Sequence, residues 1–142
     1  MKADLAALEA ALRRDVRGEV RFDAQARALY ATDASNYRQV PIAVTYPRDG
    51  VDVEAIVAAC RAHGAPVLCR GGGTSLAGQT CNVAVVMDFT RHMNLILALD
   101  PVARTARVQP GVVLDQLRDE AEKHHLTFAP DPSTHPNCTL GG

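Results

Sequence analysis

The sequence lacks any apolar run long enough to cross a membrane. A transmembrane helix needs roughly 20 consecutive apolar residues, and the apolar stretches in these 142 residues are far shorter. The first residues, MKADLAALEAALRRD, also lack the continuous apolar core of a signal peptide. We therefore expect a cytoplasmic protein without a transmembrane segment, and peripheral attachment to the inner membrane stays open as an alternative.

The sequence also lacks an excess of charge and any close pairing of cysteines. There are 15 Lys and Arg against 16 Asp and Glu, so the formal net charge is -1, which argues against a nucleic-acid partner. The four cysteines form no CxxC pair and no other close metal-ligand spacing. We predict no metal site and expect buried, reduced thiols at Cys60, Cys69, Cys81 and Cys138.

What is present is the composition of an ordinary globular domain, with 47% hydrophobic and 22% charged residues. Apolar residues at Leu5, Leu8, Leu12 and Val16 predict an amphipathic N-terminal helix. A second short helix is expected after the N-cap Asp23, and residues 33–41 have the composition of a turn. We divide the chain into a helical segment, residues 1–36, and a binding domain, residues 37–142.

The next block predicts a strand, a capped helix and another strand. Residues 42–46 are rich in β-branched residues, and Asp49 followed by Asp52 resembles a capping box. The helix then carries one apolar stripe and ends at Gly64, before a strand over residues 66–70. The stripe comprises Val53, Ile56, Val57 and Cys60. Such a βαβ unit predicts two parallel strands with a right-handed crossover.

The second half of the chain predicts a different architecture. Residues 83–89 are a continuous apolar run typical of a buried strand, and residues 94–100 and 103–110 read as an antiparallel hairpin. A helix follows Pro110 and Gly111, with Leu114, Leu117 and Ala121 facing inward, and residues 128–142 are loop-like. The predicted fold class is α+β, with a small parallel βαβ lobe followed by a mainly antiparallel α+β lobe.

The segment CRGGGTSLAGQTCN, residues 69–82, carries the clearest chemical signal. Glycines lack the Cβ that blocks close approach, so successive N–H groups can point into one anion-binding concavity. No Gly-Lys-Ser/Thr follows, and the glycines are contiguous, so the segment is neither a Walker A loop nor a GxGxxG motif. It predicts a cradle for the diphosphate of a nucleotide, and a plain glycine turn between two strands is the alternative.

Three segments in order carry a resemblance to a known family. RGGGTSLAGQ, VQPGVVLDQL and FAPDPSTHPNCTLGG resemble the FAD-binding domain of the vanillyl-alcohol oxidase and p-cresol methylhydroxylase flavoproteins, over about Tyr30 to Gly142. Within that family the chain looks most like the FAD-linked D-2-hydroxy-acid dehydrogenases acting on D-lactate, glycolate or D-2-hydroxyglutarate. The resemblance implies that FAD lies between the two lobes and that the domain is incomplete at its C-terminus.

The resemblance also implies which positions surround the cofactor. Many relatives carry a histidine bonded to the flavin in the glycine loop, and Thr74 at that position predicts non-covalent FAD. Arg70 could offset the charge of the diphosphate or pair with a surface carboxylate. His135 could either approach the flavin or contact water. The implied cofactor-binding residues are Arg70, Gly71, Gly72, Gly73, Thr74, Ser75, Gly78, Gln79, Pro110, Gly111, Pro130, Asp131, Pro132, Ser133, Thr139, Gly141 and Gly142.

The resemblance implies a flavin-dependent oxidoreductase that oxidises a D-2-hydroxy acid. No catalytic base and no cation cluster for the substrate carboxylate is visible in the sequence, so the catalytic residues are unknown and the substrate site is expected in a later domain. The electron acceptor is not identified, and some relatives carry an iron–sulfur cluster in a further C-terminal region. Two alternatives remain: a non-catalytic flavin- or nucleotide-binding module serving a separate catalytic subunit, and an enolpyruvyl reductase-type flavoenzyme.

Overall fold

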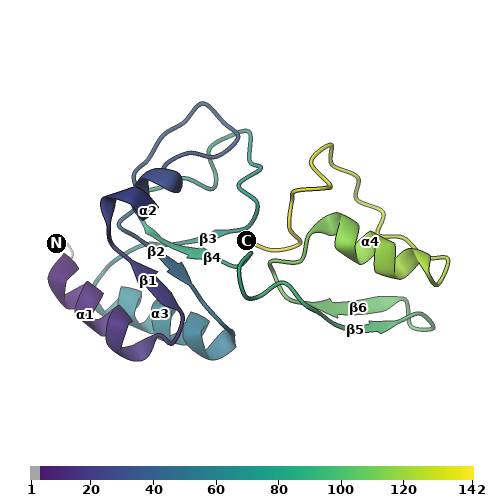
Figure 1. Cartoon of the computed structure of the whole chain (residues 1–142), viewed down its shortest axis with the longest axis horizontal. Helices are drawn as coiled ribbons and strands as arrows, with labels where there is room; N and C mark the ends of the chain where they lie inside the picture. The colour runs from purple at the N-terminus through teal and green to yellow at the C-terminus, as the bar shows by residue number, and fades with distance from the viewer. Residues whose placement is uncertain (1–3) are drawn as a thin grey trace.

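The computed structural model describes residues 4–142, which form two lobes side by side (Figure 1). The first lobe carries three helices and a four-stranded sheet, and the second carries one helix on a two-stranded hairpin. In chain order the elements are α1 Leu5–Asp15, β1 Glu19–Arg21, α2 Ala24–Leu29, β2 Ala43–Tyr46, α3 Gly50–Ala62, β3 Val67–Arg70, β4 Val85–Asp88, β5 Ile96–Asp100, β6 Thr105–Val108 and α4 Leu114–Glu122.

The sheet of the first lobe has the order β1-β2-β4-β3, and it is mixed rather than parallel. Strands β2 and β3 are both parallel to β4, but β1 pairs antiparallel with β2. The parallel orientation expected for the two strands of the βαβ unit is confirmed, but the strands are not neighbours, because β4 lies between them. Every residue of β4 is buried, and such a continuous apolar run is stable only where both faces of the strand are covered. The three residues of β1 were too few for a periodic signal.

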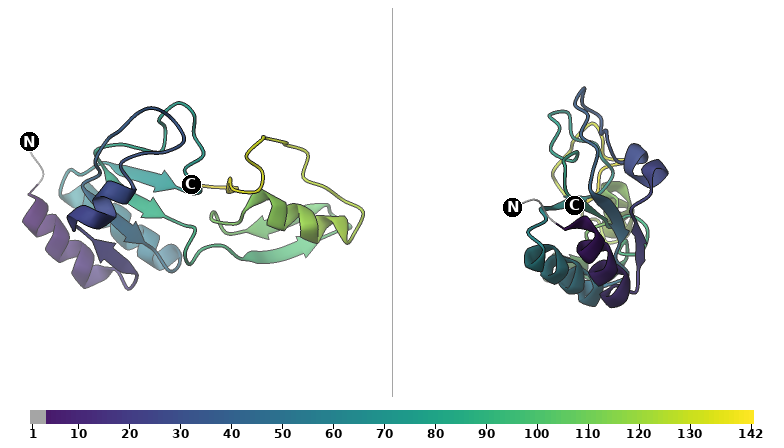
Figure 2. Two further views of the ribbon diagram at one scale, coloured as in Figure 1. Left: turned by 45° about the horizontal axis from the view of Figure 1, so that its top comes forward. Right: turned by 90° about the vertical axis from the view of Figure 1, so that its left-hand side faces the viewer.

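Helices α1 and α3 lie side by side against the sheet of the first lobe (Figure 2). Their contact is made by Leu8 and Leu12 of α1 and Ile56 of α3, all of which are fully buried. The predicted stripe of α3 was wrong at Val57, which is exposed, while Ala59 is buried in its place. Residues from both sides of position 36 share this core, and the domain boundary expected there stays a prediction.

Two aspartates at the start of α3 connect it to the N-terminal segment. The Asp49 carboxylate accepts hydrogen bonds from the amide N of Val51 and Asp52, which confirms the predicted N-cap. The fully buried Asp52 does not complete the expected capping box. It accepts instead from the amide N of Arg17, Gly18 and Arg48, at 3.1, 3.0 and 2.9 Å. Asp52 thereby holds the turn between α1 and β1 against α3.

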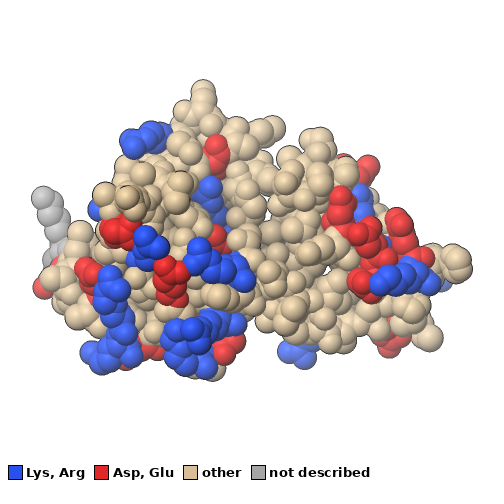
Figure 3. All heavy atoms as spheres, viewed as in Figure 1, with Lys and Arg blue, Asp and Glu red and all other residues tan. Residues whose placement is uncertain are grey.

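The charged side chains of the first lobe lie mostly on its outer surface. Lys and Arg are interspersed with Asp and Glu on the face shown in Figure 3. Arg21 pairs with both Glu19 and Asp23, and Arg91 pairs with Glu19 while stacking over the ring of Tyr46 at 3.8 Å. These ion pairs are solvent-exposed, so we assign them little net stabilisation.

The second lobe is the predicted antiparallel hairpin with α4 packed on it (Figure 1). The inward positions of α4 are confirmed, since Leu114, Leu117 and Ala121 are buried. Residues 123–142 contain no helix or strand, as expected for the tail. None of the helices within residues 4–142 combines the length and the apolar character that crossing a bilayer requires.

The cysteines are only partly as expected. All four are free thiols; Cys60 and Cys81 are buried, but Cys69 is exposed and Cys138 is half-buried. Cys69 is exposed because β3 is an edge strand of the sheet. Burial raises the pKa of the Cys60 thiol to about 11, so this thiol stays protonated near neutral pH.

Candidate FAD-binding site

The glycine loop lies at the carboxyl ends of the parallel strands, where it connects β3 to β4. Open α/β sheets bind ligands at this edge. Here the loop meets the last residues of the chain around a hollow of about 210 Å³. The lining residues are Gly71, Gly72, Gly73, Thr74, Ser75, Thr80, Thr139, Gly141 and Gly142. Eight of these nine were predicted from the sequence, and the structure brings them together from two lobes.

The backbone N–H groups at the start of the glycine loop are unpaired within the described residues. Within residues 4–142, the amide N–H groups of residues 71–75 donate to no protein acceptor. The carbonyl of Gly73, in contrast, is occupied by a hydrogen bond from the amide N of Ala34, at 3.0 Å. A run of unpaired N–H groups beside glycines is the arrangement that binds phosphate oxygens.

Close packing against the tail explains why consecutive glycines are needed here. A Cβ on Gly71 would overlap Thr139 Oγ1, and a Cβ on Gly72 would overlap the carbonyl O of Asn137. Gly73 has a φ of 66°, in the left-handed region that favours glycine. These contacts give a packing reason for glycine at positions 71 and 72.

The tail segment that closes the hollow is held by the start of the second lobe. The amide N of Leu140 donates to Val112 O at 2.9 Å, and the amide N of Gly141 donates to Pro110 O at 2.9 Å. The amide N of Gly111 donates to Met93 O at 2.8 Å, beside the end of β4. Pro110 and Gly111 therefore lie behind the wall that Gly141 forms, and they do not line the hollow.

Ser75 and Gln79, two polar residues implied to bind the cofactor, form hydrogen bonds within the loop. Ser75 Oγ accepts from the amide N of Ala77 and Gln79, both at 3.2 Å, and donates to Gln79 Oε1. The Thr74 hydroxyl, by contrast, makes no hydrogen bond within residues 4–142. Of the hydroxyl groups of Thr74 and Ser75, that of Thr74 is therefore free to bind a phosphate.

The Arg70 side chain is engaged by main-chain carbonyls. Its Nη2 donates to Thr32 O at 2.8 Å, and its Nη1 donates to Thr80 O at 3.0 Å and Tyr30 O at 3.4 Å. Its guanidinium also lies over the Tyr30 ring, 5.1 Å from the centroid. Arg70 pairs with no carboxylate within the described residues, and it does not line the hollow.

The predicted segment of residues 130–133 lies apart from the hollow and is held by α4. Arg118 Nη2 donates to Pro130 O at 2.7 Å and to Asp131 Oδ1 at 2.9 Å. His135 is held in the same way, since its Nδ1 lies 2.7 Å from Asp115 Oδ2. His135 therefore contacts a carboxylate, a partner that neither sequence interpretation anticipated.

Sequence reasoning missed the contribution of residues 30–37. Asp33 Oδ2 accepts from the amide N and the Oγ1 of Thr80, at 3.2 and 2.9 Å. Desolvation raises the pKa of Asp33, but hydrogen bonds from Ser35 and Thr80 outweigh it and lower the pKa to about 2. The only local signal was the turn composition of this segment, which cannot reveal contacts with residues that lie 47 positions away.

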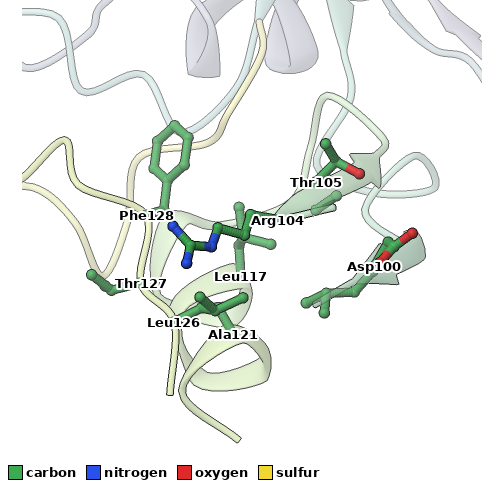
Figure 4. Close-up of a pocket in the computed structure, with 10 residues that line it drawn as sticks. Asp100, Arg104, Thr105, Leu117, Ala121, Leu126, Thr127 and Phe128 are labelled. Carbon is green, nitrogen blue, oxygen red and sulfur yellow. The ribbon is translucent and has the colours of Figure 1, made fainter. Parts of the chain in front are cut away.

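A second, more apolar hollow lies in the other lobe, between the hairpin and α4. It has a volume of about 290 Å³, and in Figure 4 the Arg104 side chain extends across it toward Phe128. Leu117 and Ala121 form its floor. Asp100 and Arg104 are its charged residues, and nothing in their arrangement resembles the row of N–H donors in the glycine loop.

The two-lobed architecture is shared with parts of solved oxidase structures. 4-Ethylphenol oxidase from Gulosibacter chungangensis matches 94% of this chain with a TM-score of 0.77 at 21% identity, over 27% of that chain. 6-Hydroxy-D-nicotine oxidase from Arthrobacter nicotinovorans matches 88% with a TM-score of 0.73 at 26% identity, over 27% of its own length.

Sequence comparison assigns the family itself. Residues 41–142 match the FAD binding domain family, and the chain belongs to it. It is 38% identical over 138 residues, 95% of the chain, to D-2-hydroxyglutarate dehydrogenase of Pseudomonas putida. It is 40% identical over 133 residues, 89% of the chain, to glycolate oxidase subunit GlcD of Bacillus subtilis. The chain spans only 14% and 28% of these two relatives.

Proposed function

We propose that this chain supplies the diphosphate-binding part of a flavoenzyme that oxidises a D-2-hydroxy acid. The observation that carries the proposal is the row of unpaired N–H groups at residues 71–75, in a segment that lines a hollow together with the tail. The residues present fit a diphosphate, because the N–H groups of residues 71–75 have no acceptor within residues 4–142. A hollow of about 210 Å³ is smaller than the roughly 300–1,000 Å³ that encloses a whole drug-sized ligand, so it suits the diphosphate alone.

The residues proposed to hold the cofactor fall into two groups. Main-chain N–H groups of the glycine loop bind the diphosphate, with the Thr74 hydroxyl as a further donor. The tail residues Thr139, Gly141 and Gly142 complete the wall, and the loop residues Gly78 and Gln79 lie outside the lining of the hollow. Arg70, Pro110, Gly111 and residues 130–133 support this wall from outside the hollow. When bound, FAD would supply the acceptor for the hydride, which carries both electrons of the oxidation.

The hydroxy-acid substrate is assigned by relationship. The names of two relatives, D-2-hydroxyglutarate dehydrogenase and glycolate oxidase subunit GlcD, support this substrate class. The base, the carboxylate-binding cations and the electron acceptor are proposed to lie elsewhere in the longer protein; the acceptor is a quinone, a cytochrome, an iron–sulfur centre or oxygen. Thr74 has no nitrogen to bond the flavin, so the proposed FAD is held without a covalent link.

The proposal is tested on the purified full-length protein. An absorbance spectrum is expected to show bound flavin, and D-lactate, glycolate and D-2-hydroxyglutarate are then compared with their L-isomers where these exist, using dye reduction. Acid precipitation is expected to release all of the flavin, and a yellow pellet would contradict the non-covalent assignment. A protein that binds no flavin after FAD is added would overturn the function. Oxidation of reduced nicotinamide without dye reduction would favour the enolpyruvyl reductase-type alternative.

A further inference from the structure

Residues 30–37, called here the bracing segment, lie beside the glycine loop (Figure 2). The residues that contact each other are 38 to 47 positions apart in the sequence. They also precede residues 41–142, the part that matches the family. Their contacts with the loop therefore concern residues whose role the family assignment leaves open.

Arg70 connects the bracing segment to both ends of the loop. Its own backbone ends β3, where the loop begins, and its Nη1 donates to Thr80 O near the loop's end. The same guanidinium donates to the carbonyls of Tyr30 and Thr32. One planar side chain thus binds two carbonyls of the bracing segment and one carbonyl of the loop, a task that suits the several fixed donors of arginine.

Three further contacts hold the loop along its length. Asp33 accepts from the amide and the hydroxyl of Thr80. The amide N of Ala34 donates to Gly73 O. The ring of Tyr37 packs on Gly78, where an added Cβ would meet the ring atom Cδ2 at 2.7 Å. Each of these contacts engages a carbonyl of the loop, the distal end of the loop or its outer side. They leave the N–H groups of residues 71–75 free.

The bracing segment is itself anchored on the sheet. The hydroxyl of Tyr30 donates to Asp88 Oδ2 at the end of β4, and the Asp88 side chain is buried. Asp88 Oδ1 in turn accepts from the amide N and the Oγ1 of Thr90, both at 2.7 Å. The position of the loop is therefore tied to the central strand of the first lobe.

We propose that Arg70 and Asp33 are positioning residues that hold the glycine loop in its anion-binding conformation before FAD arrives. A glycine-rich loop loses much conformational freedom when it is ordered. If the protein has already ordered it, binding no longer bears that cost. The inference rests on the proposed function for the identity of the anion, and on the contacts above for the positioning role.

The charges of the two residues provide a sharp test. Were Arg70 and Asp33 acting directly on the diphosphate, removing Arg70 would weaken FAD binding, and removing Asp33 would strengthen it by relieving repulsion. As positioning residues, both must weaken FAD binding when removed. The sign of the Asp33 effect therefore separates the two explanations.

The experiment measures FAD affinity by fluorescence titration in the full-length apoprotein. Arg70→Met and Asp33→Ala are each expected to weaken binding by about tenfold or more, the effect of losing charge-assisted hydrogen bonds. Asp33→Asn keeps one carbonyl acceptor and should recover part of the loss. Arg61→Met is the matched control, because Arg61 is exposed on α3 and its side chain makes no hydrogen bond or ion pair within residues 4–142. The FAD affinity of this variant should equal that of the wild type.

Hydrogen exchange of the apoprotein provides the second readout. Amides of residues 71–80 are expected to exchange faster in Arg70→Met and Asp33→Ala, with amides of β2 and β4 unchanged. Tighter FAD binding by Asp33→Ala, or unchanged affinity together with unchanged exchange, would overturn the positioning role. A wild-type protein that binds no FAD would overturn the proposed function instead, and the exchange data would still decide whether the loop is braced.

Discussion

The two lobes differ in how completely they bury their own strands. In the first lobe every residue of β2 and β4 is buried, between flanking strands and beneath the helices. In the second lobe every residue of β5 and β6 is exposed or half-buried, and Leu97 keeps 52% of its surface exposed. The first lobe has a core of its own, whereas the hairpin is covered mainly by α4 and the tail.

This difference matters because the proposed FAD site takes one wall from each lobe. The glycine loop is attached to the well-packed sheet and to the bracing segment, while Thr139 and Gly141 are attached to the start of α4. Elements with few buried contacts open more readily than a packed core. We therefore expect the glycine loop to be the fixed half of the site and the tail to be the half that opens.

The largest expected effect tests the stability of the first lobe. Asp52→Ala removes the buried acceptor of three backbone N–H groups, and we expect the free energy of unfolding to fall by about 3 kcal/mol. Urea denaturation of the full-length protein measures this loss. Asp119→Ala, at an exposed position on α4 without a partner in residues 4–142, should change it by less than about 0.5 kcal/mol. Equal effects from the two variants would contradict the assigned role of Asp52.

The second prediction tests the independence of the second lobe. Leu117→Ala removes a buried side chain of α4, and we expect a loss of about 2 kcal/mol, because the neighbouring hollow already limits its packing. Hydrogen exchange should accelerate in residues 96–122 and stay unchanged in β2 and β4. Acceleration in both lobes together would show that they unfold as one unit.

The third prediction tests the junction between the two walls. Gly72→Ala places a methyl group against the carbonyl of Asn137, which should force the tail away from the loop and weaken FAD binding by about tenfold, or 1.4 kcal/mol. Gly50→Ala is the matched control, because nothing lies within 4 Å of a Cβ at that position. If both variants bind FAD as the wild type does, the tail is not a wall of the site.

The smallest expected effect concerns acid. The pKa of Asp33 is lowered to about 2, below the value of about 3.9 for an unfolded chain. Its stabilising contribution is therefore fully present above about pH 4 and is lost as the pH falls through about 2. The difference in unfolding free energy between wild type and Asp33→Asn should shrink over that window by less than about 1 kcal/mol. A difference that stays constant with pH would show that the Asp33 charge contributes nothing.

Local signals predicted most of the elements and most of the residues lining the hollow. Asp23, Asp49 and Gly64 were correctly placed at helix ends, because a cap depends on residues only a few positions away. The hairpin and the inward face of α4 were predicted for the same reason. The insertion of β4 between β2 and β3 was not, since strand order depends on contacts between distant segments.

The sequence by itself determined the glycine loop and the tail, because both are contiguous motifs recognised by residue type and spacing, and it led to the proposal that the loop binds an anion. The tertiary structure alone decided what surrounds them. It turned the Arg70 side chain toward carbonyls, set Asp33 against Thr80, and placed residues 130–133 under Arg118. Those contacts join residues up to 47 positions apart, and only the packing of the folded chain brings such residues within hydrogen-bonding distance.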